Sequence, residues 1–152
     1  MRQILIATAA LVAALSSPAA AAPKAAGCRL TPKQVVTRFM DEFYTRKQVR
    51  SAFERWVDPG YIQHNPYAAT GRAAAVAFLT GFVEQNPGYR AKIHRIIADG
   101  NLVAVHSQVW MKEGDNGSAV VDILRVEGCR VMEHWDVLQP VPEQAANSNG
   151  MF

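Results

Sequence analysis

Four runs of alternating apolar and polar residues fill the C-terminal part of the chain and predict four β-strands. Short turn sequences rich in glycine, aspartate and asparagine separate these runs. Tight turns between alternating runs are typical of β-hairpins, so the strands are expected to form one antiparallel sheet. The expected strands are residues 89–98, 102–111, 118–127 and 130–137.

Three helices are predicted before the strands. The first begins with a capping box, in which Thr31 is the N-cap, Pro32 takes the first helical position and Gln34 closes the box. Apolar residues then recur at the spacing of an amphipathic helix. The later elements are helices over about 49–56 and 72–85, with an ordered loop over 61–67 between them.

The order of helices first and strands afterwards predicts an α+β fold, with the helices gathered on one face of the sheet. We expect a cone-shaped α+β barrel, in which three N-terminal helices pack on a curved four-stranded antiparallel sheet. A curled sheet closed by helices leaves a concave mouth, which is where a small-molecule ligand is expected to bind.

The first residues have the pattern of a secretory signal peptide. Arg2 precedes an apolar run over 4–15 that is too short to span a bilayer, and cleavage is expected after Ala21. The alternative is a lipoprotein signal with Cys28 as the lipidated residue. The expected organisation is a signal peptide (1–21), a leader (22–30), a domain (31–142) and a tail (143–152), in a periplasmic or secreted protein without membrane contact after cleavage.

The chain of 152 residues contains two cysteines, Cys28 and Cys129. An oxidising compartment favours a disulfide between them, and two free buried thiols are the alternative. The formal net charge is +3, and basic residues alternate with acidic ones over 38–55. This mixture predicts a solvated helix surface, so nucleic acid is not expected as a partner.

Ionisable side chains lie within strands that otherwise resemble a protein core. Because side chains alternate across a strand, His106 shares one face of its run with Gln108 and Trp110, and Asp122 shares a face with apolar neighbours. Both faces are expected to be pocket walls. The last hairpin leaves open whether His134 or Trp135 faces inward, since Asp122 pairs with Trp135 across a two-residue turn and with His134 if Cys129 forms a bulge. Asp136 lies in the same final run.

Three segments resemble a known family. The segment YIQHNP at 61–66, DILRVE at 122–127 and EHWDV at 133–137 are similar to the SnoaL-like polyketide cyclase branch of the nuclear transport factor 2-like superfamily. They resemble more closely its predicted aldol-condensation enzymes. The resemblance covers residues 31–152, and it departs at Gly128-Cys129, where relatives turn on Asp-Gly.

This resemblance implies an α+β barrel that commonly forms a homodimer, with a pocket between sheet and helices. It implies that Asp122 acts as general acid/base beside a carbonyl, assisted by His106 and His134, and it favours the bulged register. The residues expected to contact the ligand are His64, Tyr61, Gln108 and Trp110.

Four interpretations of these polar residues remain open. Acid/base catalysis of an aldol or isomerase type needs a base beside a carbonyl and an acid for the developing oxyanion, and one buried carboxylate can serve both steps. The alternatives are a self-satisfied hydrogen-bond network, a carrier for a small apolar ligand, and a metal site formed by the histidines and Asp122. The spacing does not match dedicated metal motifs, so neither a metal nor another cofactor is expected.

Overall fold

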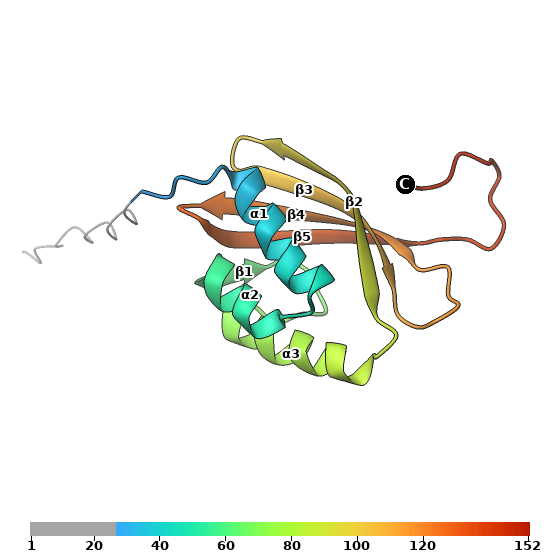
Figure 1. The fold of residues 1–152 in the computed structure, drawn as a ribbon, viewed down its shortest axis with the longest axis horizontal. Coiled ribbons are helices and arrows are strands. Elements are labelled where there is room, and N and C mark those ends of the chain that lie inside the picture. Colours follow the sequence, from blue (N-terminus) through green and yellow to red (C-terminus); the bar gives the residue numbers. More distant parts are fainter. Residues whose placement is uncertain (1–26) are drawn as a thin grey trace, which may run out of the picture.

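The described part of the protein, residues 27–152 of a computed structural model, forms three α-helices and one mixed five-stranded sheet (Figure 1). The predicted signal peptide and most of the leader lie outside the described residues. No helix within 27–152 combines the length and apolar character that a membrane crossing requires. The three helices and the single sheet confirm the α+β architecture that the order of the elements predicted.

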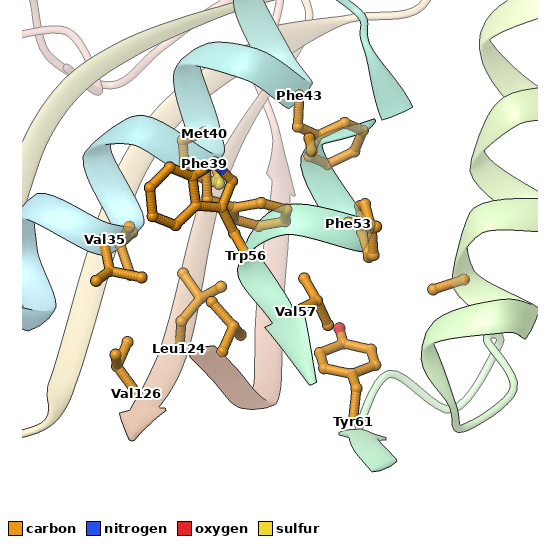
Figure 2. Packing of buried hydrophobic residues seen from close by; sticks show 14 of the residues in the cluster. Val35, Phe39, Met40, Phe43, Phe53, Trp56, Val57, Tyr61, Leu124 and Val126 are labelled. Carbon is orange, nitrogen blue, oxygen red and sulfur yellow. The ribbon is translucent and has the colours of Figure 1, made fainter. Parts of the chain in front are cut away.

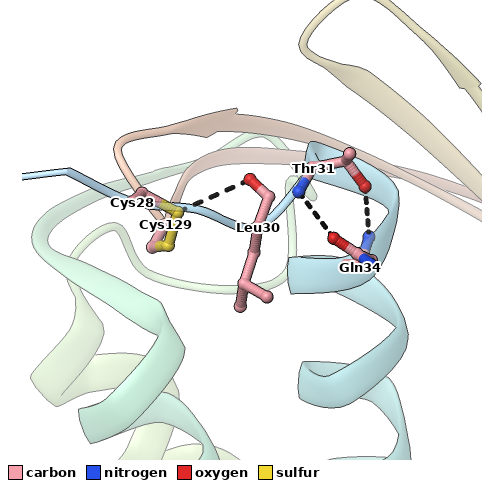
Figure 3. Close-up of a disulfide and its surroundings, with 5 residues drawn as sticks. All are labelled: Cys28, Leu30, Thr31, Gln34 and Cys129. Carbon is pink, nitrogen blue, oxygen red and sulfur yellow. Dashed lines mark hydrogen bonds between the residues drawn. A yellow bond between two sulfur atoms is a disulfide. The ribbon is translucent and has the colours of Figure 1, made fainter.

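The helices begin where the local sequence favours them. α1 (Pro32–Met40) carries the predicted capping box: the Gln34 N–H donates to Thr31 Oγ1 at 3.2 Å, and the Thr31 N–H donates to Gln34 Oε1 at 2.9 Å (Figure 3). α1 continues into a π-helical turn, η1. The remaining helical elements are η1 (Asp41–Thr45), α2 (Val49–Trp56) and α3 (Arg72–Gln85).

The sheet contains five strands instead of the four predicted, in the order β1-β5-β4-β3-β2. The additional strand is β1 (Val57–Gln63), which pairs in parallel with β5 (Arg130–Pro140). Its sequence contains Pro59 and Gly60, and its apolar and polar residues do not alternate. A strand at the edge of a sheet tolerates both residues, because it pairs on one side only. Part of the expected loop over 61–67 therefore belongs to the sheet. The other strands are β2 (Arg90–Asp99), β3 (Leu102–Trp110) and β4 (Ser118–Glu127).

The core lies between the helices and one face of the sheet, which we call the inner face (Figure 2). Phe39 packs edge-to-face on Phe53 with ring centroids 5.1 Å apart, so α1 and α2 meet through aromatic rings. Leu124 is 2% exposed and faces them from β4. Burial of each such side chain stabilises the fold by about 1.5–3 kcal/mol. The helices thus occupy one face of the sheet, and the opposite, outer face carries partly exposed residues.

The Cys28–Cys129 disulfide joins the N-terminal segment to the β4–β5 turn, with Cα atoms 5.5 Å apart (Figure 3). Glu127 pairs with Arg130, so the hairpin has a two-residue loop, and both loop residues have positive φ (50° for Gly128 and 70° for Cys129). A non-glycine residue in this region costs about 1–2 kcal/mol. The disulfide predicted from the two cysteines is therefore present, and it ties down a turn residue with an unfavourable backbone conformation.

The register of the last hairpin matches neither of the two alternatives predicted. Val126 pairs with Val131, whereas the preceding Arg125 pairs with Glu133, so Met132 is an extra residue on β5. The bulge therefore lies on β5 and not at Cys129. As a result Asp122 pairs with Asp136, His134 lies on the inner face, and Trp135 lies on the outer face.

Candidate active site

The polar residues of the inner face meet where β4 and β5 run side by side. Asp122 is 5% exposed, and it is one of two buried polar residues within the described chain. Its cross-strand partner is Asp136, and His134 lies diagonally opposite on the same face. Alternation along the two strands thus places two carboxylates and one imidazole together inside an otherwise apolar layer.

Both carboxylate oxygens of Asp122 have partners. The Tyr44 hydroxyl, from η1, donates to Oδ2 at 2.9 Å. His134 Nε2 lies 2.9 Å from Oδ1. A buried carboxylate is tolerated only when its oxygens are hydrogen-bonded, so these two contacts account for the position of Asp122 within the core.

The ring orientation of His134 is set by Gln63, the last residue of β1. The backbone N–H of Asn65 donates to Gln63 Oε1 at 2.9 Å, so this atom acts as an acceptor. His134 Nδ1 lies 2.9 Å from the same oxygen and must therefore carry a hydrogen. Nε2 of His134 and Oδ1 of Asp122 then share a single proton, which can lie on either group.

Asp136 is held by a residue from the loop that follows β1. The side-chain amide of Asn65 donates to its carboxylate, with Nδ2 at 2.8 Å from each oxygen. Gln63 pairs with His134 in the parallel β1–β5 ladder, so the edge strand brings both amides to the site. The positions of Gln63 and Asn65 therefore depend on the strand that the sequence pattern did not predict.

Three tyrosines near Asp122 resist ionisation. Burial, and next the negative charge of Asp122, hold the pKa of Tyr44 well above its usual value. The same two causes, in the same order, strongly raise the pKa of Tyr61 and of Tyr89. All three hydroxyls consequently keep their protons and remain hydrogen-bond donors across the physiological range.

These residues form the polar end of a cavity of about 250 Å³. The remaining wall is mostly apolar and comes from the helices, and among the described residues no lysine or arginine lines it. An apolar cavity with a few convergent polar groups is the usual form of a small-molecule site. The principal apolar lining residues are Phe39, Met40, Phe43, Phe53, Phe78 and Leu79.

The predicted position of His106 in this pocket is wrong. Val105 pairs with Asp122, and cross-strand partners lie on the same face, so His106 lies on the opposite, outer face. There its Nδ1 lies 2.9 Å from an Arg95 guanidinium nitrogen. Alternation predicted the two faces of β3 and of β4 correctly, but it did not predict the offset between the two strands. The prediction that both polar faces are pocket walls was therefore wrong.

Gln108 and Trp110 share the face of His106 and also lie outside the cavity. Gln108 donates to the Asn116 carbonyl oxygen at 3.1 Å, and the Arg90 guanidinium lies 4.4 Å from the Trp110 ring centroid. These contacts are local to the outer face. The prediction that Gln108 and Trp110 contact a ligand in the pocket is therefore wrong.

The segment 61–65 divides between the two faces. Tyr61 is 4% exposed and lines the cavity, as Gln63 does. His64 instead stacks on Trp135, with centroids 4.5 Å apart and planes inclined by 8°. The prediction that His64 contacts a ligand in the pocket is thus wrong, because His64 directly follows the cavity residue Gln63 and its side chain lies on the opposite face.

Four cavity residues escaped the sequence analysis. Tyr44 and Tyr89 were assigned no polar role, because periodicity marks their burial but not where a hydroxyl points. Gln63 and Asn65 lay in the ordered loop predicted over 61–67, between the second and third helices. Their polarity was a usable signal, but only the parallel pairing of β1 with β5 gives these residues a partner.

Asp122, His134 and Asp136 could also hold a metal ion. One ligand atom from each residue lies within 4.8 Å of the others. Imidazole nitrogen with two carboxylate oxygens is a donor set that several divalent transition metals accept. The histidines 64 and 106, considered for such a site from sequence, do not contribute to it.

Comparison with known proteins identifies the family of this chain and shows which solved structures share its fold. A curated relative from Aspergillus carbonarius (strain ITEM 5010), named "Probable cyclase otaY", is 36% identical over 61 residues, which is 40% of this chain and 47% of the relative. The match thus spans about half of that protein. An NTF2-like protein of unknown function from Cytophaga hutchinsonii has a TM-score of 0.61 at 15% identity, covering 74% of this chain and 94% of its own.

A proposed isomerase of the SnoaL-like family from Agrobacterium tumefaciens str. C58 is also similar in structure. Its TM-score is 0.58 at 14% identity, with 69% of this chain and 94% of that chain covered. At such low identity these structures establish the fold alone. The family model of the SnoaL-like domain matches residues 36–134, which contain all but one of the cavity's polar residues. The chain therefore belongs to the SnoaL-like domain family.

Proposed function

We propose that this protein catalyses acid/base chemistry at a carbon beside a carbonyl, of the aldol-cyclisation or isomerase type, on a small apolar compound. The observation that carries the proposal is the 2.9 Å contact between His134 Nε2 and Asp122 Oδ1 at the polar end of an apolar cavity. Such a pair can accept a proton from a substrate and return it, and the net charge of the pair and the substrate together does not change.

The reaction begins with the carboxylate of Asp122 and the imidazolium of His134. Asp122 removes a proton from the carbon beside the carbonyl, the C–H electron pair forms a C=C bond, and the carbonyl oxygen becomes an enolate oxygen. His134 keeps its contact with Gln63 Oε1, and this contact holds the imidazole beside Asp122. Return of the proton to another carbon gives isomerisation. In aldol closure the enolate carbon attacks a second carbonyl carbon, the electron pair of that C=O bond moves to its oxygen, and this oxygen takes the proton back from Asp122. A positioned acid/base accelerates such a step about 10²–10⁴-fold.

The family membership supports this assignment. One relative is named a cyclase, and one structural neighbour is a proposed isomerase. Because the sequence match to the former spans under half of it, and the likeness to the latter concerns fold alone, the shared chemistry remains our proposal. The residues that carry it here are Asp122 and His134.

Deuterium uptake from D2O into 2-tetralone, followed by NMR, tests the proposal with a compound that has acidic C–H bonds beside its carbonyl. The wild-type protein is expected to accelerate exchange, and Asp122→Asn to reduce it at least about 100-fold. Asp99→Asn is the matched control, because Asp99 lies at the exposed end of β2. Equal exchange by the wild type and Asp122→Asn would refute the proposed role of Asp122.

Binding without turnover is the second candidate function. It is favoured by the fact that both Asp122 oxygens and both His134 ring nitrogens already have partners within the protein. A carrier would bind 2-tetralone, as measured by calorimetry, and leave its exchange rate at the uncatalysed value. The same pair of measurements therefore separates the two functions.

Export and self-association complete the proposal. A disulfide is typical of oxidising compartments, which supports a periplasmic or secreted location. N-terminal sequencing of the native protein should find a start at Ala22.

The outer sheet face exposes Ile97, Ile123 and Val137, which fits a homodimer, and sedimentation should then give twice the monomer mass.

A further inference from the structure

Asp136 is a cavity-lining carboxylate that the proposed reaction does not use. Its side-chain partner within residues 27–152 is the Asn65 amide, whose Nδ2 lies 2.8 Å from each carboxylate oxygen. Asp136 pairs with Asp122 across β4 and β5, and one oxygen of each lies within 4.8 Å of the other and of a His134 ring nitrogen. A carboxylate offers about four lone-pair sites, so Asp136 keeps free acceptors beside a second carboxylate and an imidazole.

The charge of this group of three side chains favours a cation. Both carboxylates face a cavity whose described lining contains no lysine or arginine, and His134 is the basic side chain of that lining. Asp122 is 5% exposed, so water screens its charge poorly. Buried charges are normally paired or coordinate a metal. A divalent cation beside a neutral imidazole would balance both carboxylates, whereas an imidazolium balances one.

The spacing of the candidate ligand atoms fits an octahedral ion. His134 Nε2 and Asp122 Oδ1 lie 2.9 Å apart. Two atoms at this separation, each about 2.1 Å from an ion, subtend an angle of about 90° at it, which is the angle between neighbouring ligands of an octahedron. A tetrahedral ion would need a separation of about 3.4 Å. Because an Asp136 oxygen lies within 4.8 Å of the other ligand atoms, a shift of less than about 2 Å brings it to the same ion.

Each of the three side chains is oriented by a further residue outside the group. These outer partners are Gln63, Tyr44 and Asn65, which contact His134, Asp122 and Asp136, respectively. Outer partners of this kind regularly accompany metal ligands, because they fix the ligands in position before the ion binds. The Gln63 oxygen keeps a hydrogen on Nδ1 of the imidazole, so a neutral ring presents its Nε2 lone pair to the ion.

We propose that Asp122, His134 and Asp136 bind a divalent first-row transition metal ion in octahedral coordination, with its remaining positions open to the cavity. One imidazole nitrogen and two carboxylate oxygens form a donor set that Mn²⁺, Fe²⁺, Co²⁺ and Ni²⁺ accept. The ion replaces the proton that Asp122 and His134 share. Sequence spacing did not indicate this site, because Asp136 joins Asp122 on the inner face only through the extra residue Met132.

Calorimetric titration of the wild-type protein with Co²⁺ tests the site directly. One ion per chain is expected to bind, and Mg²⁺, which prefers oxygen ligands alone, should bind at least about tenfold more weakly. The absence of a binding heat up to about 1 mM Co²⁺ would refute the site. Equal affinity for Mg²⁺ would also refute it, since the imidazole would then have no role.

The variant Asp136→Asn removes one ligand charge and leaves the proposed catalytic pair intact. Gln63→Ala removes only an outer partner and should weaken Co²⁺ binding about 10–100-fold, and Asp136→Asn should weaken it at least as much. His106→Ala is the matched control, because it removes an imidazole from the outer face and should leave the affinity within about twofold. Equal affinities of the wild type and Asp136→Asn, or a larger loss for His106→Ala, would contradict the proposed ligands.

The broadening of histidine NMR signals by Mn²⁺ locates the ion without any variant that must fold. Mn²⁺ is paramagnetic, and it broadens the signals of nuclei more strongly the closer they lie. When less than one equivalent is added, the ring signals of His134 should disappear before those of His64, His94 and His106. Earlier disappearance at any of these three would place the ion away from the cavity and overturn the proposal.

The effect of the ion on catalysis rests on the proposed function. A bound ion occupies the lone pairs of Asp122 and His134, so saturating Co²⁺ should slow 2-tetralone exchange at least about tenfold, and EDTA should restore it. Co²⁺ binding by a wild-type protein that accelerates no exchange would refute the catalytic proposal and retain the metal site. Exchange by a protein that binds no Co²⁺ would do the reverse.

Discussion

The two faces of the sheet carry similar residue types and use them differently. On the inner face His134 bonds to a buried carboxylate and a fixed amide at the end of a cavity. On the outer face His106 contacts Arg95 and stacks against the C-terminal Phe152 at 5.5 Å, while His64 stacks on Trp135. One of the four histidines therefore lines the cavity, and its chemical environment distinguishes it from the others.

The difference between the faces arises from registers and not from composition. Asp122 and His106 lie on adjacent strands in similar apolar–polar patterns, yet the pairing of Val105 with Asp122 puts them on opposite sides. A shift of one residue in that pairing would bring His106 inward. Candidate residues on neighbouring strands should therefore be tested in pairs, one from each face.

The largest expected effect separates the two histidines. His134→Ala should lower the rate of 2-tetralone exchange about 10²–10⁴-fold, because it removes the partner that shares the Asp122 proton. His106→Ala should leave the rate within twofold. NMR exchange kinetics at one pH compare both variants with the wild type, and a larger loss for His106→Ala would invert our assignment of the faces.

Two neighbouring residues on β4 test the packing difference. Leu124→Ala on the inner face should lower the free energy of unfolding by about 2–5 kcal/mol, since it leaves a cavity in the core. Ile123→Ala, at a side chain 37% exposed on the outer face, should cost less than about 1 kcal/mol. Urea denaturation at low protein concentration measures both. Equal costs would mean that the outer face is buried against a partner.

Removal of a single hydroxyl gives the next largest effect. Tyr44→Phe takes away the donor to Asp122 Oδ2 and should lower the free energy of unfolding by about 1–3 kcal/mol, because a buried acceptor is left unpaired. Arg95→Ala removes the contact to His106 on the outer face and should change stability by about 0.5 kcal/mol or less. Thermal unfolding of the two variants side by side checks the difference.

Alkaline pH should lower the free energy of unfolding through the buried tyrosines of the inner face. Their raised pKa values mean that Tyr61 and Tyr89 stay protonated in the folded state while the unfolded chain releases these protons near pH 10. Stability is therefore full below pH 10 and falls as pH rises above it, by about 1.4 kcal/mol per unit for each tyrosine. Urea midpoints from pH 9 to 11 should fall less steeply for Tyr89→Phe, and identical slopes would contradict this.

Local signals in the sequence predicted much of the fold. The capping box at Thr31 and the alternation in the last four strands depend on neighbours within a few residues, and they predicted α1 and β2–β5. The edge strand β1 escaped prediction because Pro59 and Gly60 interrupt its pattern. Its stability comes from pairing with β5, a contact between segments distant in the chain.

The candidate site was harder to predict than the fold because it depends on offsets between strands. Polarity within apolar runs identified Asp122 and His134, and the resemblance to a known family identified Tyr61; all three line the cavity. The sequence could not reveal the extra residue Met132 on β5, which decides that His134 and Asp136 share a face with Asp122. Bulges have weak sequence signatures. His106 was misplaced for a different reason, because alternation within a strand does not reveal the offset between β3 and β4.

The ring nitrogens of the four histidines, observed by ¹⁵N NMR while 2-tetralone is added, test most directly whether the ligand site lies on the inner face. Our account predicts that the Nδ1 and Nε2 signals of His134 shift in proportion to bound ligand, and that those of His64, His94 and His106 stay within the linewidth. Shifts at His106 or His64 with an unchanged His134 would contradict it.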